Sequence, residues 1–188
     1  GAAGMFLEDQ VWPKRCGHMK GKRVIQVDEH VQKIRAAVDA RRSRDFFIVA
    51  RTDARQVNGL DDAIRRCRRY KEAGADALFV EAPRSTDELG TIARELPAPL
   101  VANMLEGGVT PLLTKEELEE LGFQLVVCPL TALYASAKAL QEMFDLIKTS
   151  GTTRAALDRL IPFQQFHEVI GLDAYYTLDE QYRVPDEG

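Results

Sequence analysis

Four polar side chains in this sequence each directly follow a short apolar run. They are Glu8, Arg51, Glu81 and Asn103. Carboxylate, guanidinium and amide groups can bind small anions and move protons. In a parallel α/β barrel the carboxyl ends of all strands converge on one face, where active sites lie. Four such residues in succession therefore favour a shared site, although the alternative is that they cap helices or form ion pairs under loops.

A basic loop with a single thiol follows the first apolar run. Cys16 has Lys14 and Arg15 before it and His18 two residues after it. Nearby positive charge favours the thiolate form, which suits a nucleophile or a general acid/base. The alternative is a solvated basic loop with an incidental thiol. Zinc is not expected here, because no second Cys or His stands at ligand spacing.

The elements that must position these residues can be read from the apolar pattern. The runs over 4–7, 46–50, 77–80, 100–102 and 125–127 predict strands. Most have no polar alternation, which is typical of strands buried on both faces of a parallel sheet. Amphipathic stretches predict helices over 28–41, 61–73, 86–96, 114–121 and 130–148. Repeated strand–helix units with right-handed crossovers predict a parallel α/β sheet or barrel.

The overall composition excludes several classes of protein. The chain has 188 residues, of which 45% are hydrophobic and 29% charged, as in an ordinary globular domain. Three cysteines are too few and too widely spaced for a disulfide scaffold. The net charge of −4 gives no overall basic footprint for nucleic acid. No apolar run approaches the roughly 20 residues of a membrane span. We therefore expect neither a nucleic-acid partner nor a membrane span.

The remaining cysteines and histidines are predicted to be structural. Cys67 lies within the Arg-rich stretch 65–69 and is expected to face the sheet, with the arginines forming a solvated helix face. Cys128 is expected to be a buried strand-end residue. His30 and His167 lie in helical patterns, which favours packing over catalysis.

The motifs, taken in order, resemble a known family. Glu8-Asp9-Gln10-Val11-Trp12-Pro13-Lys14-Arg15-Cys16-Gly17-His18 resembles the signature of the isocitrate lyase and phosphoenolpyruvate mutase superfamily. Arg51-Thr52-Asp53-Ala54, Val80-Glu81-Ala82-Pro83 and Ala102-Asn103-Met104 fall where the later motifs of that family stand. The stretch 103–111 is most similar to the branch that contains petal death protein and dimethylmalate lyase, whereas the related methylisocitrate lyases usually carry a Thr-Glu-Phe-Gly version there.

This resemblance implies a role for each candidate residue. Cys16 would be the general acid/base on a mobile gating loop, with Glu81 as a further catalytic residue. Glu8 would be a carboxylate of a Mg²⁺ or Mn²⁺ site. The residues implied to bind substrate are Gly17, His18, Arg51, Asn103 and Thr131. The implied activity is that of a Mg²⁺-dependent C–C bond lyase or hydrolase. It would act on small 2-hydroxy or 2-oxo dicarboxylates, of the oxaloacetate, 2-alkylmalate or methylisocitrate type, through an enolate.

The resemblance also implies an architecture and partners. The chain would supply about strands 4–8 of a (β/α)8 TIM barrel, with C-terminal helices of the type that is swapped between subunits. Residues 1–150 would form the barrel part and residues 151–188 a helical extension, in which 162–182 packs between subunits. The main metal ligands would lie in an N-terminal part absent from this sequence. A homotetramer, or a partner chain, would cover the open barrel edge. We expect an intracellular compartment, either cytoplasm or an organelle matrix.

Other functions stay open at this point. The chain could be a catalytically degenerate family member that serves as a structural or assembly subunit, or a relative that binds a carboxylate without turnover. The joint presence of Cys16, His18, Arg51, Glu81 and Asn103 argues against decay. A third alternative is a phosphonate-type phosphorylmutase similar to carboxyvinyl-carboxyphosphonate phosphorylmutase. The Cys-Gly-His loop, which the phosphonate mutases of the family lack, favours a lyase or hydrolase instead.

Overall fold

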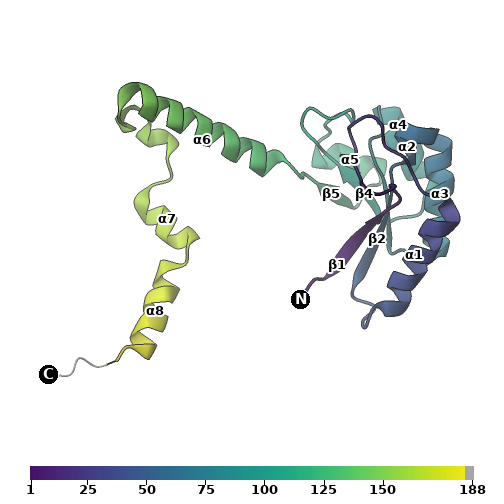
Figure 1. The fold of residues 1–188 in the computed structure, drawn as a ribbon, viewed down its shortest axis with the longest axis horizontal. Coiled ribbons are helices and arrows are strands. Elements are labelled where there is room, and N and C mark those ends of the chain that lie inside the picture. Colours follow the sequence, from purple (N-terminus) through teal and green to yellow (C-terminus); the bar gives the residue numbers. More distant parts are fainter. Residues whose placement is uncertain (185–188) are drawn as a thin grey trace. The chain divides into compact units, whose positions relative to one another are not determined.

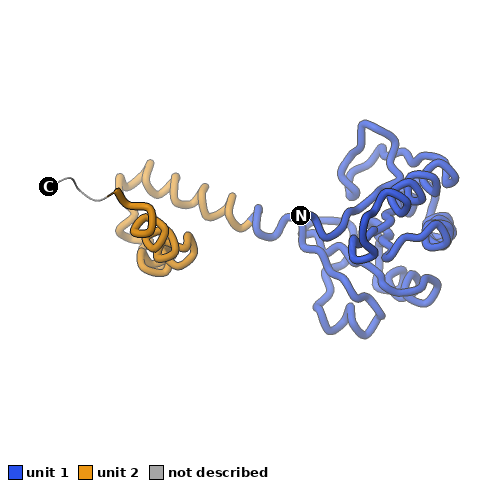
Figure 2. The backbone as a smooth tube through the Cα atoms, turned by 90° about the horizontal axis from the view of Figure 1, so that it is seen from below, with its two compact units in different colours: residues 1–134 blue, residues 135–188 orange. Residues whose placement is uncertain are grey.

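A computed structural model describes residues 1–184. They form two compact units, residues 1–134 and the residues from 135 onward, which are coloured separately in Figure 2. The helix α6 (Thr131–Ser150) runs across the boundary between the units. The predicted division after residue 150 falls at the end of this helix, and it stays a prediction.

The first unit is built on a curled sheet of five parallel strands. These are β1 (Gly4–Glu8), β2 (Phe47–Thr52), β3 (Ala77–Val80), β4 (Leu100–Asn103) and β5 (Leu125–Val127). They are hydrogen-bonded in chain order, so each strand pairs only with its sequence neighbours (Figure 1). The sheet is a half-barrel, and the predicted partial α/β barrel is therefore confirmed.

The central strands are apolar throughout because both of their faces are covered. Leu78 and Leu100 pack in the larger core cluster beneath the helices, whereas Phe79 and Val101 pack in a second, smaller cluster. All four side chains are buried. This is why the strand runs lack the alternation of a half-exposed sheet.

Five helices cover one face of this sheet (Figure 1). They are α1 (Val27–Ala40), α2 (Ala54–Asn58), α3 (Leu60–Glu72), α4 (Thr86–Glu95) and α5 (Lys115–Leu121). The hydroxyl of Ser85 caps α4, and Thr114 forms a reciprocal capping box with Glu117 at the start of α5. These caps satisfy backbone N–H groups that a helix start leaves free. The short helix α2 is an element that the sequence pattern does not predict.

Of the three predictions for Cys67, the arginine-rich face and Cys128, only the first agrees with the structure. Cys67 faces the sheet, as predicted, and burial raises the pKa of its thiol. Arg66 contradicts the solvated arginine face, because only 6% of it is exposed and its guanidinium donates to Asp62 and Asp9. The prediction that Cys128 is buried is wrong. It follows β5, which is the last strand of the sheet and has no further strand beside it.

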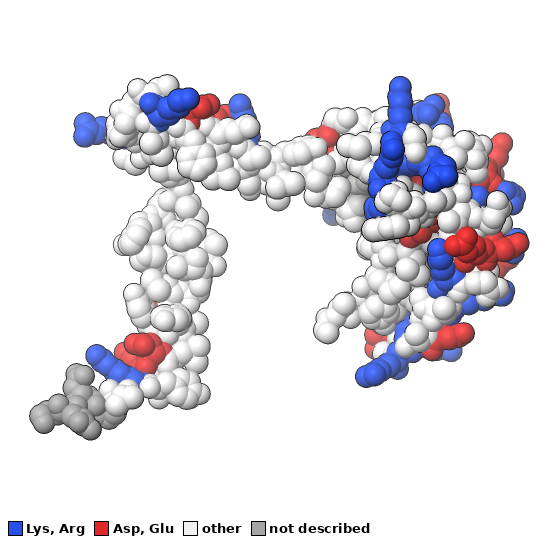
Figure 3. Space-filling view, in the orientation of Figure 1, with Lys and Arg blue, Asp and Glu red and all other residues white. Residues whose placement is uncertain are grey.

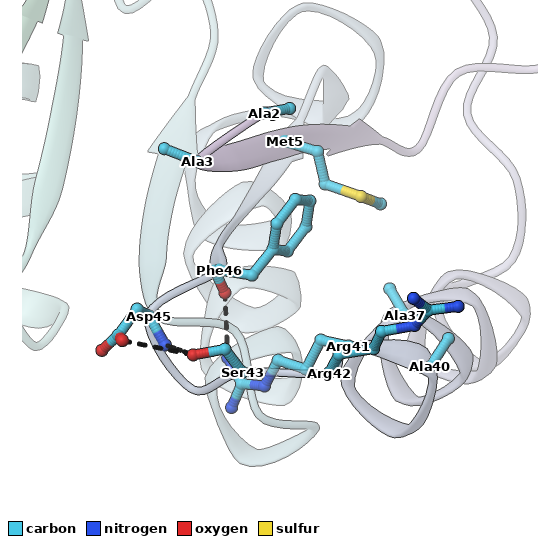
Figure 4. A pocket seen from close by; sticks show the side chains of 10 residues that line it. All are labelled: Ala2, Ala3, Met5, Ala37, Ala40, Arg41, Arg42, Ser43, Asp45 and Phe46. Atoms are coloured by element: carbon cyan, nitrogen blue, oxygen red, sulfur yellow. Dashed lines mark hydrogen bonds between the residues drawn. The ribbon is translucent and has the colours of Figure 1, made fainter.

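A cavity of about 620 Å³ lies where α1 ends beside the beginning of β1 (Figure 4). Its lining residues are Ala2, Ala3, Met5, Ala37, Ala40, Arg41, Arg42, Ser43, Asp45 and Phe46. The cavity lies at the amino end of β1. Active sites in α/β barrels lie at the carboxyl ends of strands, so this cavity is not the candidate active site.

The second unit consists of helices with little core of their own. After α6 come a 3-10 turn (Arg154–Arg159), α7 (Phe163–Val169) and α8 (Leu172–Tyr182), which form the helical segment predicted over 162–182. Neither α7 nor α8 buries a residue. Lys, Arg, Asp and Glu are sparse on the surface of this unit seen in Figure 3. Within residues 1–184, no helix is both long enough and apolar enough to span a bilayer.

Candidate active site

A cavity of about 540 Å³ lies at the carboxyl ends of the strands, beneath the loop that follows β1. Its lining includes all but one of the predicted site residues, namely Glu8, Cys16, Gly17, His18, Arg51, Glu81 and Asn103. Thr131 is the exception. Its hydroxyl donates to the carboxylate of Glu106, and its neighbour Leu130 lines the cavity instead. The parallel strands thus bring together side chains that are far apart in the sequence.

Arg51 is fixed by a two-pronged contact with Asp53. Its Nε and Nη2 donate to the two carboxylate oxygens of Asp53 at 3.0 and 3.1 Å. The guanidinium also lies over the ring of Phe79, 5.2 Å from the ring centroid. Burial opposes the charge on Arg51, but the bond to Asp53 and the nearby carboxylate of Glu81 outweigh it, so the pKa of Arg51 is raised. The site therefore holds a permanent cation in a defined orientation.

Asp53 is itself held by groups that the sequence motifs did not single out. Lys22 Nζ donates to Asp53 Oδ1 at 2.9 Å, and the backbone N–H of Asp53 donates to Asp9 Oδ1 at 2.9 Å. Burial alone would raise the pKa of Asp53, but Arg51 and Lys22 together lower it. Asp9 also accepts from Thr52 Oγ1 at 2.7 Å and from Tyr70 OH at 2.8 Å. A buried network of hydrogen bonds therefore fixes Asp53, and through Asp53 it fixes the guanidinium of Arg51.

Gly17 lies directly against Arg51 and Glu81. A Cβ atom at Gly17 would stand 2.1 Å from Glu81 Oε1 and 2.5 Å from Arg51 Nη2. Both side chains are held by other partners, so neither can move away without breaking a charged contact. Only glycine lets the loop backbone come this close.

His18 connects the loop to the opposite side of the cavity. Its Nδ1 accepts a hydrogen bond from the backbone N–H of Val109 at 3.0 Å. Its Nε2 lies 3.2 Å from Glu81 Oε1. An Nδ1 that accepts cannot carry a proton, so this hydrogen bond places the ring proton on Nε2, which faces the carboxylate without forming a hydrogen bond to it. Gly108 is needed beside it, because a Cβ there would lie 2.6 Å from His18 Nδ1.

Glu81 is the central acceptor of the site. Its side chain is 1% exposed. Asn103 Nδ2 donates to its two oxygens at 3.2 and 3.4 Å, and Arg51 Nη2 lies 3.6 Å from Oε1. The following residue, Ala82, has a φ of 59°, a conformation that residues with a Cβ rarely adopt. These contacts support a role for Glu81 in holding Arg51, His18 and Asn103 in place.

The donor set does not fit a metal ion on its own. The Glu8 carboxylate forms an ion pair with Lys14 at 2.6 Å and lies 3.5 Å from Arg51 Nε, so its charge is already balanced. Over residues 1–184, no group of three or more His, Cys, Asp or Glu side chains is arranged to hold a metal. A divalent-ion site here would need further oxygen donors from outside these residues.

The half-barrel and the polar cavity at its strand ends define the class as an α/β-barrel type protein, and the comparisons give the family. A family model described as phosphoenolpyruvate phosphomutase matches residues 1–148. Petal death protein of Dianthus caryophyllus is 51% identical over 183 residues, covering 97% of this chain and 58% of that protein. Carboxyvinyl-carboxyphosphonate phosphorylmutase, chloroplastic, of Arabidopsis thaliana is 53% identical over 185 residues. The match covers 97% of this chain and 55% of that protein. The chain belongs to the PEP mutase/isocitrate lyase superfamily.

Solved structures agree with this family. A crystal structure of 2,3-dimethylmalate lyase has a TM-score of 0.87 at 36% identity, covering 99% of this chain and 63% of that chain. The structure of oxaloacetate acetylhydrolase in complex with 3,3-difluorooxalacetate has a TM-score of 0.88 at 35% identity. The match covers 98% of this chain and 62% of that chain. Phosphonopyruvate hydrolase was solved with oxalate and Mg²⁺; its TM-score is 0.78 at 27% identity, covering 97% and 63%. The chain thus spans less than two thirds of the length of each relative named here.

The tautomer of His18 gives a direct test of the closed site. Nitrogen NMR of the imidazoles should show His18 with its proton on Nε2, and the three histidines of the chain keep the spectrum simple. Gly108→Ala should change this signal, because the new Cβ takes the space of Nδ1. His30, which is buried beneath the sheet, is the internal control and should not change. A proton on Nδ1 in the wild-type protein would contradict the geometry described above.

Proposed function

We propose that this chain carries the substrate-binding and proton-transfer part of a C–C bond lyase or hydrolase. The substrates would be small 2-hydroxy or 2-oxo dicarboxylates of the oxaloacetate, 2-alkylmalate or methylisocitrate type. The observation that carries this proposal is the loop after β1, which rests on Arg51 and Glu81 and brings Cys16 to the same cavity. The names of solved neighbours, 2,3-dimethylmalate lyase and oxaloacetate acetylhydrolase, support it.

Arg51 is the proposed carboxylate anchor. Asp53 accepts from its Nε and Nη2, and Glu81 also lies close to Nη2, which leaves Nη1 to donate to an anion. Asn103 stands at the end of β4, two strands along the sheet from β2, and can donate to a second oxygen of the substrate. A guanidinium that is already oriented loses little conformational freedom on binding. The anchor therefore places the bond to be broken at a fixed distance from the loop.

Cys16 is the proposed proton donor. Cleavage of the bond beside a hydroxyl or carbonyl carbon leaves a carbanion, or its enolate, on the departing fragment. The thiol can deliver a proton to that carbon, because Cys16 lines the same cavity as Arg51. Gly17 is buried against the strand ends, whereas Cys16 beside it is exposed, so we expect the loop to close further over a bound substrate to exclude water from the reacting atoms.

Mg²⁺ is the cofactor expected for this activity, and the phosphonopyruvate hydrolase complex with oxalate and Mg²⁺ supports it. Glu8 would be the contribution of this chain. Because Glu8 is paired with Lys14 and the described residues hold no metal cluster, we assign no step to the ion.

A phosphorylmutase is the second candidate. The observation in its favour is the 53% identity to the Arabidopsis protein named carboxyvinyl-carboxyphosphonate phosphorylmutase. A phosphoryl-transfer site would need cationic groups around three equatorial oxygens. The cavity offers Arg51 and the partly neutralised Lys14. This charge set is better matched to a dicarboxylate, so we prefer the lyase or hydrolase.

Turnover tests this assignment. With Mg²⁺ present, the protein should release pyruvate, oxalate or acetate from at least one substrate of the proposed classes. Cys16→Ala should lower kcat by about 100-fold, the usual size of a lost general acid. Cys128→Ala is the matched control, since it removes another exposed thiol from outside the cavity. Unchanged turnover in Cys16→Ala would refute the role of Cys16. Conversion of a phosphonate substrate with no dicarboxylate cleavage would favour the mutase.

We also propose that the chain works as a homo-oligomer, with a tetramer as the expected state and a covering partner chain as the alternative. Large apolar side chains stay exposed on the second unit, including Phe144, Phe163, Phe166 and Tyr182. Exposed apolar surface of this extent marks an interface. The predicted compartment, cytoplasm or an organelle matrix, stays a prediction.

Light scattering on the purified protein measures this directly. The mass should be a multiple of 21.1 kDa, four-fold for the tetramer. Phe163→Asp should lower the mass by placing a charge in the apolar surface, whereas Phe6→Asp tests whether the exposed edge strand β1 also takes part in the assembly. A wild-type protein that stays at 21.1 kDa at all concentrations would contradict the homo-oligomer.

A further inference from the structure

Lys22 is a fully buried lysine at the end of the loop that carries Cys16. Its side chain and that of Asp53 are both 0% exposed. Burying an ammonium group is costly unless it is paired and hydrogen-bonded. Lys22 Nζ meets this condition in two ways, since it donates to Asp53 Oδ1 at 2.9 Å and to the backbone carbonyl of Gly17. A buried charge with such specific partners invites a functional explanation.

The two partners of Lys22 belong to different parts of the site. Gly17 lies in the loop, between Cys16 and His18, whereas Asp53 stands at the end of β2 and holds Arg51. One ammonium group therefore joins the loop to the carboxylate that orients the proposed substrate anchor. The side chain of Lys22 does not line the candidate active-site cavity.

The Asp53 end of this connection is rigid. The backbone N–H of Asp53 is fixed by Asp9, and Asp9 is fixed in turn by Thr52 and Tyr70. The loop end is held at several points. Within residues 1–184, its tip is tied to the rest of the unit by Lys22, by the contacts of His18 with Val109 and Glu81, and by the Lys14–Glu8 ion pair, and Lys14 is about half exposed. Of these ties, only Lys22 is wholly buried at both ends.

We propose that Lys22 is a positioning residue that fastens the Cys16 loop onto the Asp53–Arg51 pair, so that the proton donor and the carboxylate anchor act on one substrate molecule. The inference rests on the function proposed above for Cys16 and Arg51. It adds a distinct claim, which is that loop closure and anchor orientation share one buried charge. Loss of Lys22 leaves Asp53 still paired with Arg51, so the anchor keeps its partner while the loop loses its fastening.

This arrangement predicts a split between catalysis and binding. In Lys22→Met, kcat should fall by about 100-fold, because misplacing a reacting group by an ångström can cost that much. KM should change by less than about threefold, because Arg51 keeps its contact with Asp53. A merely structural role would instead disturb Arg51 and raise KM as well.

Trypsin gives a second readout that does not depend on turnover. Lys14 and Arg15 stand on the loop, so cleavage after them reports how often the loop opens. Cleavage in Lys22→Met should be about tenfold faster than in the wild type, because proteolysis follows the population of the open form. Lys20→Met is the matched control. It removes an exposed lysine of the same loop, and both its turnover and its cleavage after Lys14 and Arg15 should stay at the wild-type level.

The outcomes separate this inference from the proposed function. If the wild type turns over no dicarboxylate, the proposed function fails, and the trypsin rates alone still decide whether Lys22 fastens the loop. Wild-type kcat and cleavage in a folded Lys22→Met protein would overturn the inference. If Lys22→Met does not fold, Lys22→Gln, which keeps an N–H donor, takes its place. A fall in kcat with KM retained would then support the inference, and a rise in KM with kcat retained would overturn it.

Discussion

The site depends on one buried carboxylate, that of Asp53, placed between two cations. Arg51 and Lys22 both donate to it, and burial without them would oppose its charge. Asp53 can serve two partners because its own backbone is anchored to Asp9, which is fully buried just after the end of β1. The register of the parallel strands completes the arrangement, since Glu8 pairs with Arg51 across β1 and β2. An error in this register would separate the charged groups that the cavity requires.

Close backbone approach is the second constraint on the site. Gly17 and Gly108 each occupy a place where a Cβ would collide with a functional side chain. These two glycines let the loops on either side of the cavity approach each other, and His18 then joins them through Val109. The small-anion chemistry proposed for Arg51 and Cys16 therefore depends on residues that take no part in it. The metal, by contrast, finds no complete donor set among residues 1–184.

Much of the fold and the site could be predicted from the sequence because both have local signatures. The continuous apolar runs predicted the strands. The polar residues after the first four runs, Glu8, Arg51, Glu81 and Asn103, were predicted to share one site, and all four line the same cavity. The misses have a common cause. Whether Arg66, Lys22 or Cys128 is buried depends on which elements pack against it. The residue type alone, a charged or a thiol side chain, does not distinguish a buried position from an exposed one. Asp53 had a weak signal in the Arg-Thr-Asp motif, and Lys22 had none.

The central claim is that Arg51, oriented by Asp53, binds the carboxylate of the substrate. Calorimetric titration with oxalate, in buffer that contains Mg²⁺, tests it most directly. The wild type should bind oxalate, and Arg51→Met should weaken binding by about 100-fold, the size expected for a lost buried charge contact. Arg65→Met, which removes an exposed arginine on α3, should bind as the wild type does. Equal affinity in Arg51→Met and the wild type, or no oxalate binding by the wild type, would contradict the account.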